Sequence, residues 1–268
     1  LVGSEMCIKD RIDIDRLDYL ERDSFFTGVR EGIIGVDRII DMFNVHRDQL
    51  VVEEKAVYSL ENFINARRLM YWQVYLHKTA ISAERMLVNI IRRAQWLAGA
   101  GHISGCSPAL ETFLEGSFSI GDFEHNKQGV DLLQRYSLLD DHDIWSALKS
   151  WRTHPDPVLS QLSNMLLNRN IFAITLSDKP VGKSDIQMAH AGVKKTFGLG
   201  NRDSSYLFSH GTVTNEAYVT GEKRINILLK SGKVTDLAKL SDLPHIRALS
   251  KVVKKNFLCV PKSVKLAP

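Results

Sequence analysis

The chain has 268 residues, a net charge of +4 and an apolar fraction of 44%, enough for one large or two small domains with real cores. A charged fraction of 25% excludes a collagen-like repeat or a disordered tail. No run approaches the roughly 18 apolar residues of a membrane helix, so no membrane partner is expected. Cys7, Cys106 and Cys259 are odd in number and far apart, which argues against disulfides and thiolate metal sites and favours a cytoplasmic location.

The first eleven residues lack the basic start, apolar middle and cleavage site of a signal peptide. We expect residues 1–11 to be a non-native or disordered leader. Leu1 is then not the natural start, and the chain is the back portion of something longer.

From residue 12 to about residue 100, apolar spacing and helix-end signals predict helices, interrupted by one short strand at 50–54. The predicted helices of this part are 15–25, 35–43, 56–78 and 82–97. A break rich in Gly and Ser follows at 99–108.

Further helices are predicted after this break, at 108–115, 127–136, 140–153 and 157–168. Beyond Arg169 the pattern changes to strands at 171–176, 205–208, 215–219 and 225–230, with a helix at 184–197 and turns at 221–223 and 231–233. The predicted fold class is therefore mainly α with a smaller α+β region at the C-terminus.

The segment 12–23 carries the most chemical information. On a helix, Asp15, Tyr19 and Asp23 share one stripe, with Arg16 beside the first of them. A carboxylate suits a hard divalent cation, a guanidinium suits a phosphate, and a second carboxylate accepts a hydroxyl. Without further information, such a stripe is typical of a solvated amphipathic helix.

This segment resembles the last metal-ligand motif of the HD-domain deoxynucleoside triphosphate triphosphohydrolases, a family built on a helical HD bundle. The resemblance implies that Asp15 is the fourth protein ligand of a catalytic divalent metal, with Mn, Fe, Mg and Zn not distinguished. It implies that Arg16 contacts phosphate, that Tyr19 contacts the substrate, and that Asp23 accepts the 3′-hydroxyl of the deoxyribose.

A second segment, 66–78, resembles the family's Arg-to-His-Lys helix, with Arg67, Tyr71 and Tyr75 at i, i+4 and i+8. The resemblance implies that Arg67 clamps the triphosphate, that Tyr71 lines the substrate site, and that the Tyr75 ring excludes a 2′-hydroxyl. Leu76 stands where the family has a polar amide, which leaves base recognition open. The alternative is a core face of Tyr, Met and Trp.

The resemblance further implies an activating-nucleotide site between subunits, with Arg38, Lys55 and Lys78 as its cations, and a homo-oligomer, either dimer or tetramer. It divides the chain into four parts. These are the leader 1–11, the C-terminal part of the HD phosphohydrolase domain at 12–104, a helical HD-associated region at 105–168, and a mixed α+β region at 169–268.

The family's metal-binding His residues precede the Asp15 motif, whereas the first histidine here is His46. His142-Asp143 follows Asp15 and sits at a helix start, where Asp140 and Asp143 act as caps. With one ligand of four, we expect this chain alone to be inactive. The intact protein is expected to perform metal-assisted hydrolysis of dNTPs (dGTP-type) to deoxynucleoside and triphosphate.

A different class of function is suggested by residues 232–242 followed by a basic amphipathic stretch at 245–255. This pair has the order of a helix-turn-helix, so a nucleic-acid-binding module is the alternative, although not the favoured one. An oligomerisation module using the same basic helix is a third possibility.

Overall fold

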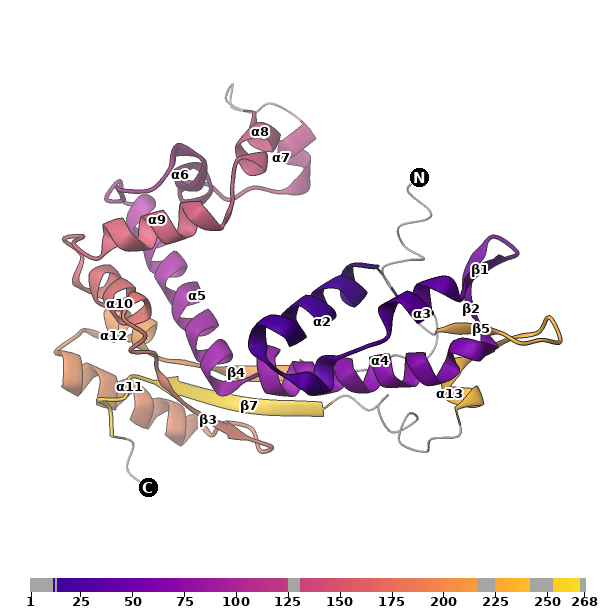
Figure 1. The fold of residues 1–268 in the computed structure, drawn as a ribbon. Coiled ribbons are helices and arrows are strands. Elements are labelled where there is room, and N and C mark those ends of the chain that lie inside the picture. The colour runs from indigo at the N-terminus through magenta and orange to yellow at the C-terminus, as the bar shows by residue number, and fades with distance from the viewer. Residues whose placement is uncertain (1–11, 13, 125–130, 216–224, 242–252, 266–268) are drawn as a thin grey trace. The chain divides into compact units, whose positions relative to one another are not determined.

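The computed structural model describes residues 12, 14–124, 131–215, 225–241 and 253–265. The leader 1–11 lies outside this part. The described chain is mainly helical with a smaller α+β region, which confirms the predicted fold class (Figure 1). It forms two compact units, Leu1–His77 with Thr212–Lys255, and Lys78–Gly211 with Asn256–Pro268.

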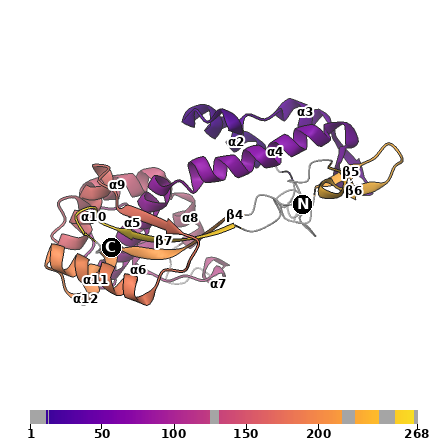
Figure 2. The ribbon, with the colours of Figure 1, turned by 90° about the horizontal axis from the view of Figure 1, so that it is seen from below.

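The first unit is built around a long helix. Its elements are α2 (Ile14–Thr27), η1 (Arg30–Gly32), α3 (Val36–Asp41), β1 (Phe43–His46), β2 (Gln49–Glu53), η2 (Glu54–Ala56), α4 (Val57–Met70), the π-turn η3 (Tyr71–Tyr75), β5 (Asn226–Leu228), β6 (Val234–Asp236) and α13 (Leu237–Leu240). Helices α2 and α3 both pack along α4 (Figure 2).

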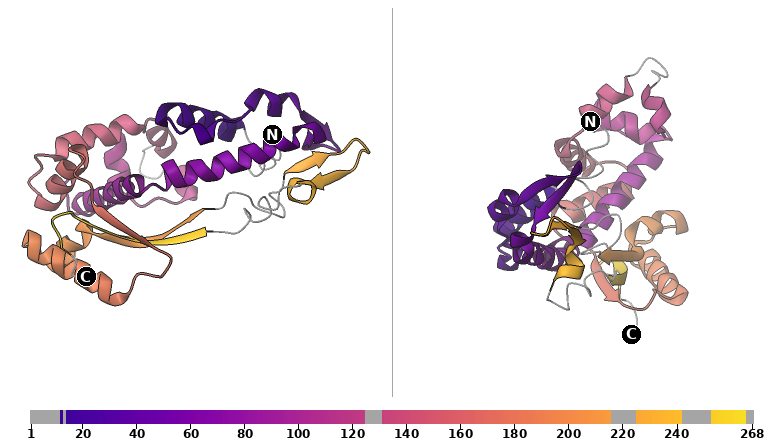
Figure 3. Two further views of the ribbon diagram at one scale, coloured as in Figure 1. Left: turned by 60° about the horizontal axis from the view of Figure 1, so that its bottom comes forward. Right: turned by 90° about the vertical axis from the view of Figure 1, so that its right-hand side faces the viewer.

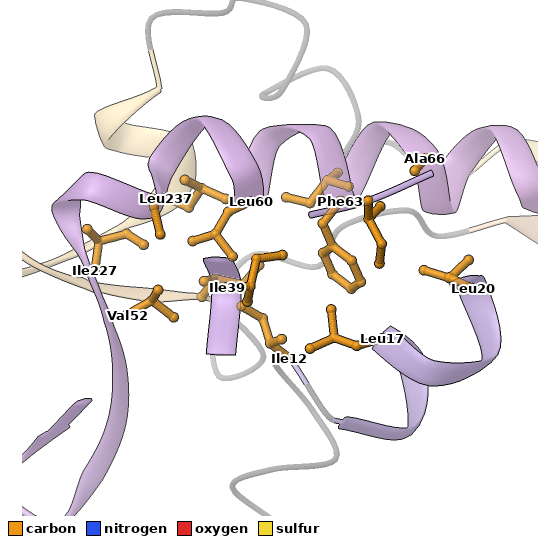
Figure 4. Close-up of a cluster of buried hydrophobic side chains, with 14 of the residues drawn as sticks. Ile12, Leu17, Leu20, Ile39, Val52, Leu60, Phe63, Ala66, Ile227 and Leu237 are labelled. Atoms are coloured by element: carbon orange, nitrogen blue, oxygen red, sulfur yellow. The ribbon is translucent and has the colours of Figure 1, made fainter. Parts of the chain in front are cut away.

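The core of the first unit draws on both ends of the chain (Figure 4). Leu17 and Leu20 from α2 meet Phe63 from α4, while Ile227 and Leu237 come from the C-terminal part. Each of these five side chains is no more than 2% exposed. Burying an apolar side chain of this size contributes about 1.5–3 kcal/mol, so the helices and the distant strands stabilise one another.

A four-stranded sheet of order β1-β2-β5-β6 closes this core. β1 and β2 form an antiparallel hairpin, and its turn holds Arg47 and Asp48 at φ of 51° and 58°. β2 then pairs in parallel with β5, with Val52 opposite Ile227. This pairing fixes the C-terminal strands to the beginning of α4.

In the described residues, the second unit combines helices with a three-stranded sheet. Its elements are α5 (Lys78–Ala98), α6 (Pro108–Glu115), α7 (Ile120–Glu124), α8 (Leu132–Ser137), α9 (Asp141–Trp151), α10 (Pro157–Leu167), β3 (Ala173–Ser177), α11 (Lys183–Phe197), α12 (Asn201–Ser204), η5 (Ser205–Leu207), β4 (Ser209–Asn215) and β7 (Val253–Val260). The sheet order is β3-β7-β4, and α11 lies beside it (Figure 3).

A buried polar face on α5 joins the parts of the second unit. Asn89 donates to the carbonyl oxygens of Tyr206 and Phe208. Arg93 is 3% exposed and donates through Nε to Asp156 at 3.0 Å and through Nη1 to Asp203 at 2.8 Å. Because buried polar groups require partners, these contacts fix the start of α10, the helix α12 and the turn η5 onto α5.

Several sequence predictions require correction. The strand predicted at 205–208 is wrong, because these residues form η5 and its C-terminal end before β4 starts at Ser209. The helix predicted at 56–78 ends at Met70, continues as a π-turn and gives way to α5.

The basic helix predicted at 245–255 does not reach its expected end, because 253–255 begin β7. Its preceding residues lie outside the described part, as do the turn at 221–223 and most of the strand at 215–219. Within the described part of the chain, no helix is long and apolar enough to cross a bilayer.

Candidate substrate site

Helix α2 presents the first motif because its opposite side is anchored in the core. Leu17, Leu20 and Ser24 are buried, so the stripe of Asp15, Tyr19 and Asp23 lies beside them at the edge of the unit. Tyr19 and Asp23 are half-buried, whereas Asp15 is exposed in the first turn. The helix thus offers these polar residues over about two turns without fully burying a charge.

The second motif lies at the C-terminal end of α4, where the helix widens into the π-turn. Leu76 N–H donates to the Tyr71 carbonyl at 2.6 Å, the i+5 pattern of a π-turn. The Arg67 guanidinium carbon lies 5.6 Å from the centre of the Tyr71 ring. Tyr71 in turn meets Tyr75 edge-to-face at 5.2 Å. The three residues therefore form one continuous surface.

Asp23 and Tyr75 connect the two motifs directly. The Tyr75 hydroxyl donates to Asp23 Oδ2 at 2.7 Å, and the Tyr75 ring meets Tyr19 edge-to-face at 6.0 Å. Burial raises the pKa of Tyr75 above its usual value, and the hydrogen bond to the Asp23 carboxylate raises it further. The phenol therefore stays protonated and acts as a donor.

The structure thus brings Tyr19, Asp23, Arg67, Tyr71 and Tyr75 together through a chain of direct contacts. The surface combines a carboxylate, a cation and three aromatic rings, groups that bind hydroxyls, anions and flat or sugar-like apolar faces. Asp15 and Arg16 lie about one turn before Tyr19 on α2.

The described residues do not make a metal site. No three His, Cys, Asp or Glu side chains among them lie together in a way that could hold an ion. Asp15 alone offers one carboxylate, whereas divalent cations in proteins need several protein or water ligands in fixed geometry. The role of Asp15 as a metal ligand remains a prediction.

The three expected effector cations are distributed over both units. Arg38 is exposed on α3, and Lys78 is the first residue of α5 in the second unit. Lys55 lines a cavity of about 390 Å³ together with Glu53, Glu54 and Lys230. The Lys230 backbone N–H donates to Glu54 Oε2, so one carboxylate of this cavity already holds a backbone donor. No contact joins Arg38 to this cavity among the described interactions.

His142-Asp143 has the capping role that its sequence position suggests. The Asp140 carboxylate accepts from the Asp143 backbone N–H, and the Asp143 carboxylate accepts from that of Asp140 at 2.9 Å. His142 is exposed. The local role of this dipeptide is therefore to cap the beginning of α9.

Gly32 was not singled out in the sequence, yet it positions the site. A Cβ at this position would lie 2.8 Å from Ser24 Cβ and 2.6 Å from Met70 Sδ. Ser24 also donates to the Val29 carbonyl at 2.7 Å. This close approach holds the C-terminal end of α2 against the end of α4, next to Asp23 and Tyr75.

Comparison with known proteins indicates which class of protein this chain resembles. Residues 34–99 match the family model of the HD-associated region. A phosphohydrolase from Bacteroides thetaiotaomicron is 45% identical, with a TM-score of 0.85 over 94% of this chain and 62% of its own chain. Part of the chain is therefore similar to an HD-associated region, and most of it is similar to a phosphohydrolase. The family-model match lies within the part expected to be the HD domain, and the four-part division of the chain stays a prediction.

Two further relatives bear on length and chemistry. YwfO of Bacillus subtilis is 28% identical over 242 residues, 87% of this chain but 52% of YwfO. A deoxynucleoside triphosphate triphosphohydrolase SAMHD1 homolog of Dictyostelium discoideum is 30% identical over 86 residues, 32% of this chain and 16% of that protein. The chain therefore spans about half the length of YwfO and a smaller part of the SAMHD1 homolog.

Proposed function

We propose that this chain is the substrate-binding, C-terminal part of an HD-type phosphohydrolase. The enzyme converts deoxynucleoside triphosphates, of the dGTP type, into deoxynucleoside and triphosphate. The observation that carries the proposal is the hydrogen bond between Tyr75 and Asp23, 52 positions apart, because it joins the two segments that resemble the family. The similarity to the Bacteroides phosphohydrolase supports the hydrolase class. The partial match to the SAMHD1 homolog supports the substrate class.

Each residue of the cluster has a role that its chemistry suits. Arg67, together with Arg16 on α2, offsets the negative charge of the triphosphate, since guanidinium groups bind phosphate oxygens through paired donors. Asp23 accepts the 3′-hydroxyl, and the rings of Tyr19, Tyr71 and Tyr75 form the apolar wall against the sugar. These residues bind and orient the substrate, while the hydrolytic step requires groups beyond this set.

Asp15 then supplies one ligand of a divalent metal, whose remaining ligands belong to other parts of the intact protein. In this proposal the chain by itself is inactive. The homo-oligomeric state and an effector-nucleotide role for Arg38, Lys55 and Lys78 remain proposals of the same kind.

The test uses the full-length protein and this chain side by side. The full-length protein, supplied in turn with Mg²⁺, Mn²⁺, Fe²⁺ and Zn²⁺, is incubated with dGTP, and the products are separated by ion-exchange chromatography. We expect deoxyguanosine and intact triphosphate in equal amounts. The chain alone should bind dGTP without hydrolysing it.

Arg67→Ala and Arg68→Ala form a matched pair, since both arginines lie in the last turn of α4. R67A should weaken dGTP binding to the chain by about tenfold or more, because a hydrogen bond to a charged group contributes roughly 1.5–3 kcal/mol. R68A should bind as the wild type does. Release of pyrophosphate or phosphate, or equal losses in both variants, would contradict the proposal. The nucleic-acid alternative rests on residues 245–255, most of which lie outside the described part of the chain.

A further inference from the structure

Four aromatic rings hold together the short helices that follow α5 in the second unit, where α8 contacts both α6 and α7 (Figure 1). The Phe113 ring of α6 meets Phe118 edge-to-face at 5.5 Å and is stacked against Phe123 of α7 at 6.3 Å. Tyr136 of α8 closes the cluster, meeting Phe113 at 6.0 Å and Phe123 at 6.1 Å, edge-to-face in both pairs. Aromatic pairs in these geometries are favourable beyond the area that they bury, so the rings form a small core of their own.

Local contacts give this small core a defined shape. Gly116 leaves the space that the Phe118 ring occupies, because a Cβ at this position would lie 2.2 Å from the ring. Asp131 caps α8 by accepting from the Gln134 backbone N–H at 3.0 Å. A surface that is ordered in this way does not have to be ordered again when a partner binds, which favours binding.

Large apolar side chains beside the rings are open to solvent. Ile120, the first residue of α7, is 85% exposed, and Leu133 of α8 is 61% exposed. Side chains three positions apart on a helix are neighbours, so Ile120 lies beside Phe123, and Leu133 lies beside the exposed Tyr136. Contiguous apolar side chains on a surface indicate an interaction site, whereas single ones do not. We call this surface the α6–α8 patch, and its members are Phe113, Phe118, Ile120, Phe123, Leu133 and Tyr136.

The helices that carry the α6–α8 patch are acidic. Glu115 ends α6 and Asp131 precedes α8, and both are exposed, while the half-buried Asp122 lies in α7. A carboxylate that caps a helix keeps its negative charge. Arg135 is the one lysine or arginine among the described residues from α6 to the end of α8. The patch therefore combines apolar side chains with negative charge.

This combination selects among the possible partners. A second copy of the chain fits poorly, since a two-fold symmetric contact places the same carboxylates opposite one another. The anionic surface of a membrane is repelled for the same reason. We propose that the α6–α8 patch docks a basic amphipathic helix of another protein. Its apolar face covers the patch, and its lysines or arginines face Glu115, Asp122 and Asp131.

The test measures the binding of fluorescent peptides to this chain by fluorescence anisotropy. The probe is a helix-forming peptide of about five turns, with leucines at i, i+3, i+4 and i+7 and lysines on the opposite face. The comparison peptides have the same composition in scrambled order, or glutamates in place of the lysines. We expect the basic amphipathic peptide to bind about tenfold more tightly than either, and its affinity to fall as salt screens the charges.

Substitutions on the patch separate the apolar from the electrostatic contribution. Ile120→Gln and Leu133→Gln should each weaken binding of the basic peptide by about tenfold, because each removes an apolar side chain from the contact. Both side chains are exposed, so neither variant loses a core residue. Glu115→Lys should weaken binding and reduce its dependence on salt. Met188→Gln, at an exposed position of α11 in the same unit, is the control and should bind as the wild type does.

Several outcomes would overturn the proposal. These are no binding of the basic peptide, equal binding of the scrambled or the acidic peptide, and equal binding by L133Q and the wild type. A wild-type dimer in sedimentation velocity that L133Q dissociates would assign the patch to a second copy instead. Binding to phosphatidylserine vesicles that L133Q abolishes would assign it to a membrane surface. Because no nucleotide enters these measurements, their failure leaves the proposed function intact.

Discussion

Arg93 and Asp156 illustrate how single residues determine the stability of the second unit. The Arg93 guanidinium lies 4.2 Å from the Trp96 ring centre and is shared between Asp156 and Asp203. Asp156 also caps α10 by accepting from the Leu159 backbone N–H at 2.8 Å. Burial by itself would raise the pKa of Asp156, but the hydrogen bonds from Arg93 and Leu159 outweigh it and lower that pKa.

Asp156→Asn should lower the free energy of unfolding at pH 7 by about 2 kcal/mol, because it removes a charge from a buried pair while keeping a good helix cap. The folded pKa of Asp156 lies below its unfolded value of about 3.9, so its contribution is complete above that pH and is lost as the pH falls further. Urea unfolding from pH 7 to pH 2 should therefore show a shallower acid loss in D156N than in the wild type. Asp141→Asn, in the first turn of α9, serves as control. Parallel curves for D156N and wild type would refute this role.

At the scale of elements, the contact between α2 and α4 decides whether the candidate site forms. Gly32 lies where a side chain would collide with Ser24 and Met70. Gly32→Ala should destabilise the protein by about 1–3 kcal/mol, the usual cost of overpacking. Gly35→Ala is the matched control, since nothing lies within 4 Å of its added Cβ and its φ is −84°. Chemical denaturation measures both, and equal stability of the two variants would contradict the close-packing argument.

The π-turn is the second element that positions the site. Deleting Gln73, which is exposed, should restore a regular helix without removing a core contact. Tyr75 would then lose Asp23, and its raised pKa should return toward the usual value of about 10. Alkaline difference spectroscopy of the phenol measures this shift, and Gln73→Ala keeps the chain length as a control. A deletion variant that titrates as the wild type does would contradict the role of the turn.

The elements that the sequence predicted correctly are those with local signals. α6 follows a Ser cap and an N-terminal Pro, and α9 has a capping box built by Asp140 and Asp143. The hairpin at Arg47-Asp48 was not predicted because such turns favour Asn-Gly, and of its first strand only Phe43 lay in a predicted element, the helix 35–43. The parallel pair of β2 and β5 joins residues far apart in sequence, which no local pattern reveals.

The candidate site could be anticipated only in part. Spacing alone placed Asp15, Tyr19 and Asp23 on one stripe, and Tyr71 near Tyr75, since helical neighbours recur at four positions. The contact between Asp23 and Tyr75 spans two helices, and only the family resemblance connected them before the structure did. The sequence pattern did not predict the π-turn, because a π-turn differs from an α-helix by a single inserted residue.

At the scale of the whole molecule, the two units have separate cores. Leu237→Ala in α13 should cost about 3 kcal/mol, since Leu237 is completely buried. Hydrogen exchange should accelerate in α2 and α4 and leave α9 and α10 protected. Leu162→Ala in α10 should produce the reverse pattern. Uniform loss of protection in both variants would show that the units unfold as one.

The discontinuous first unit has a consequence for biosynthesis. Ile227 and Leu237, which complete the core around α2 and α4, are made more than 150 residues after these two helices. Until then Leu60 and Phe63 lack part of their burial, and a nascent chain exposes apolar surface that chaperones recognise. The cluster on α2 and α4 therefore reaches its final packing only after Ile227 and Leu237 have been made.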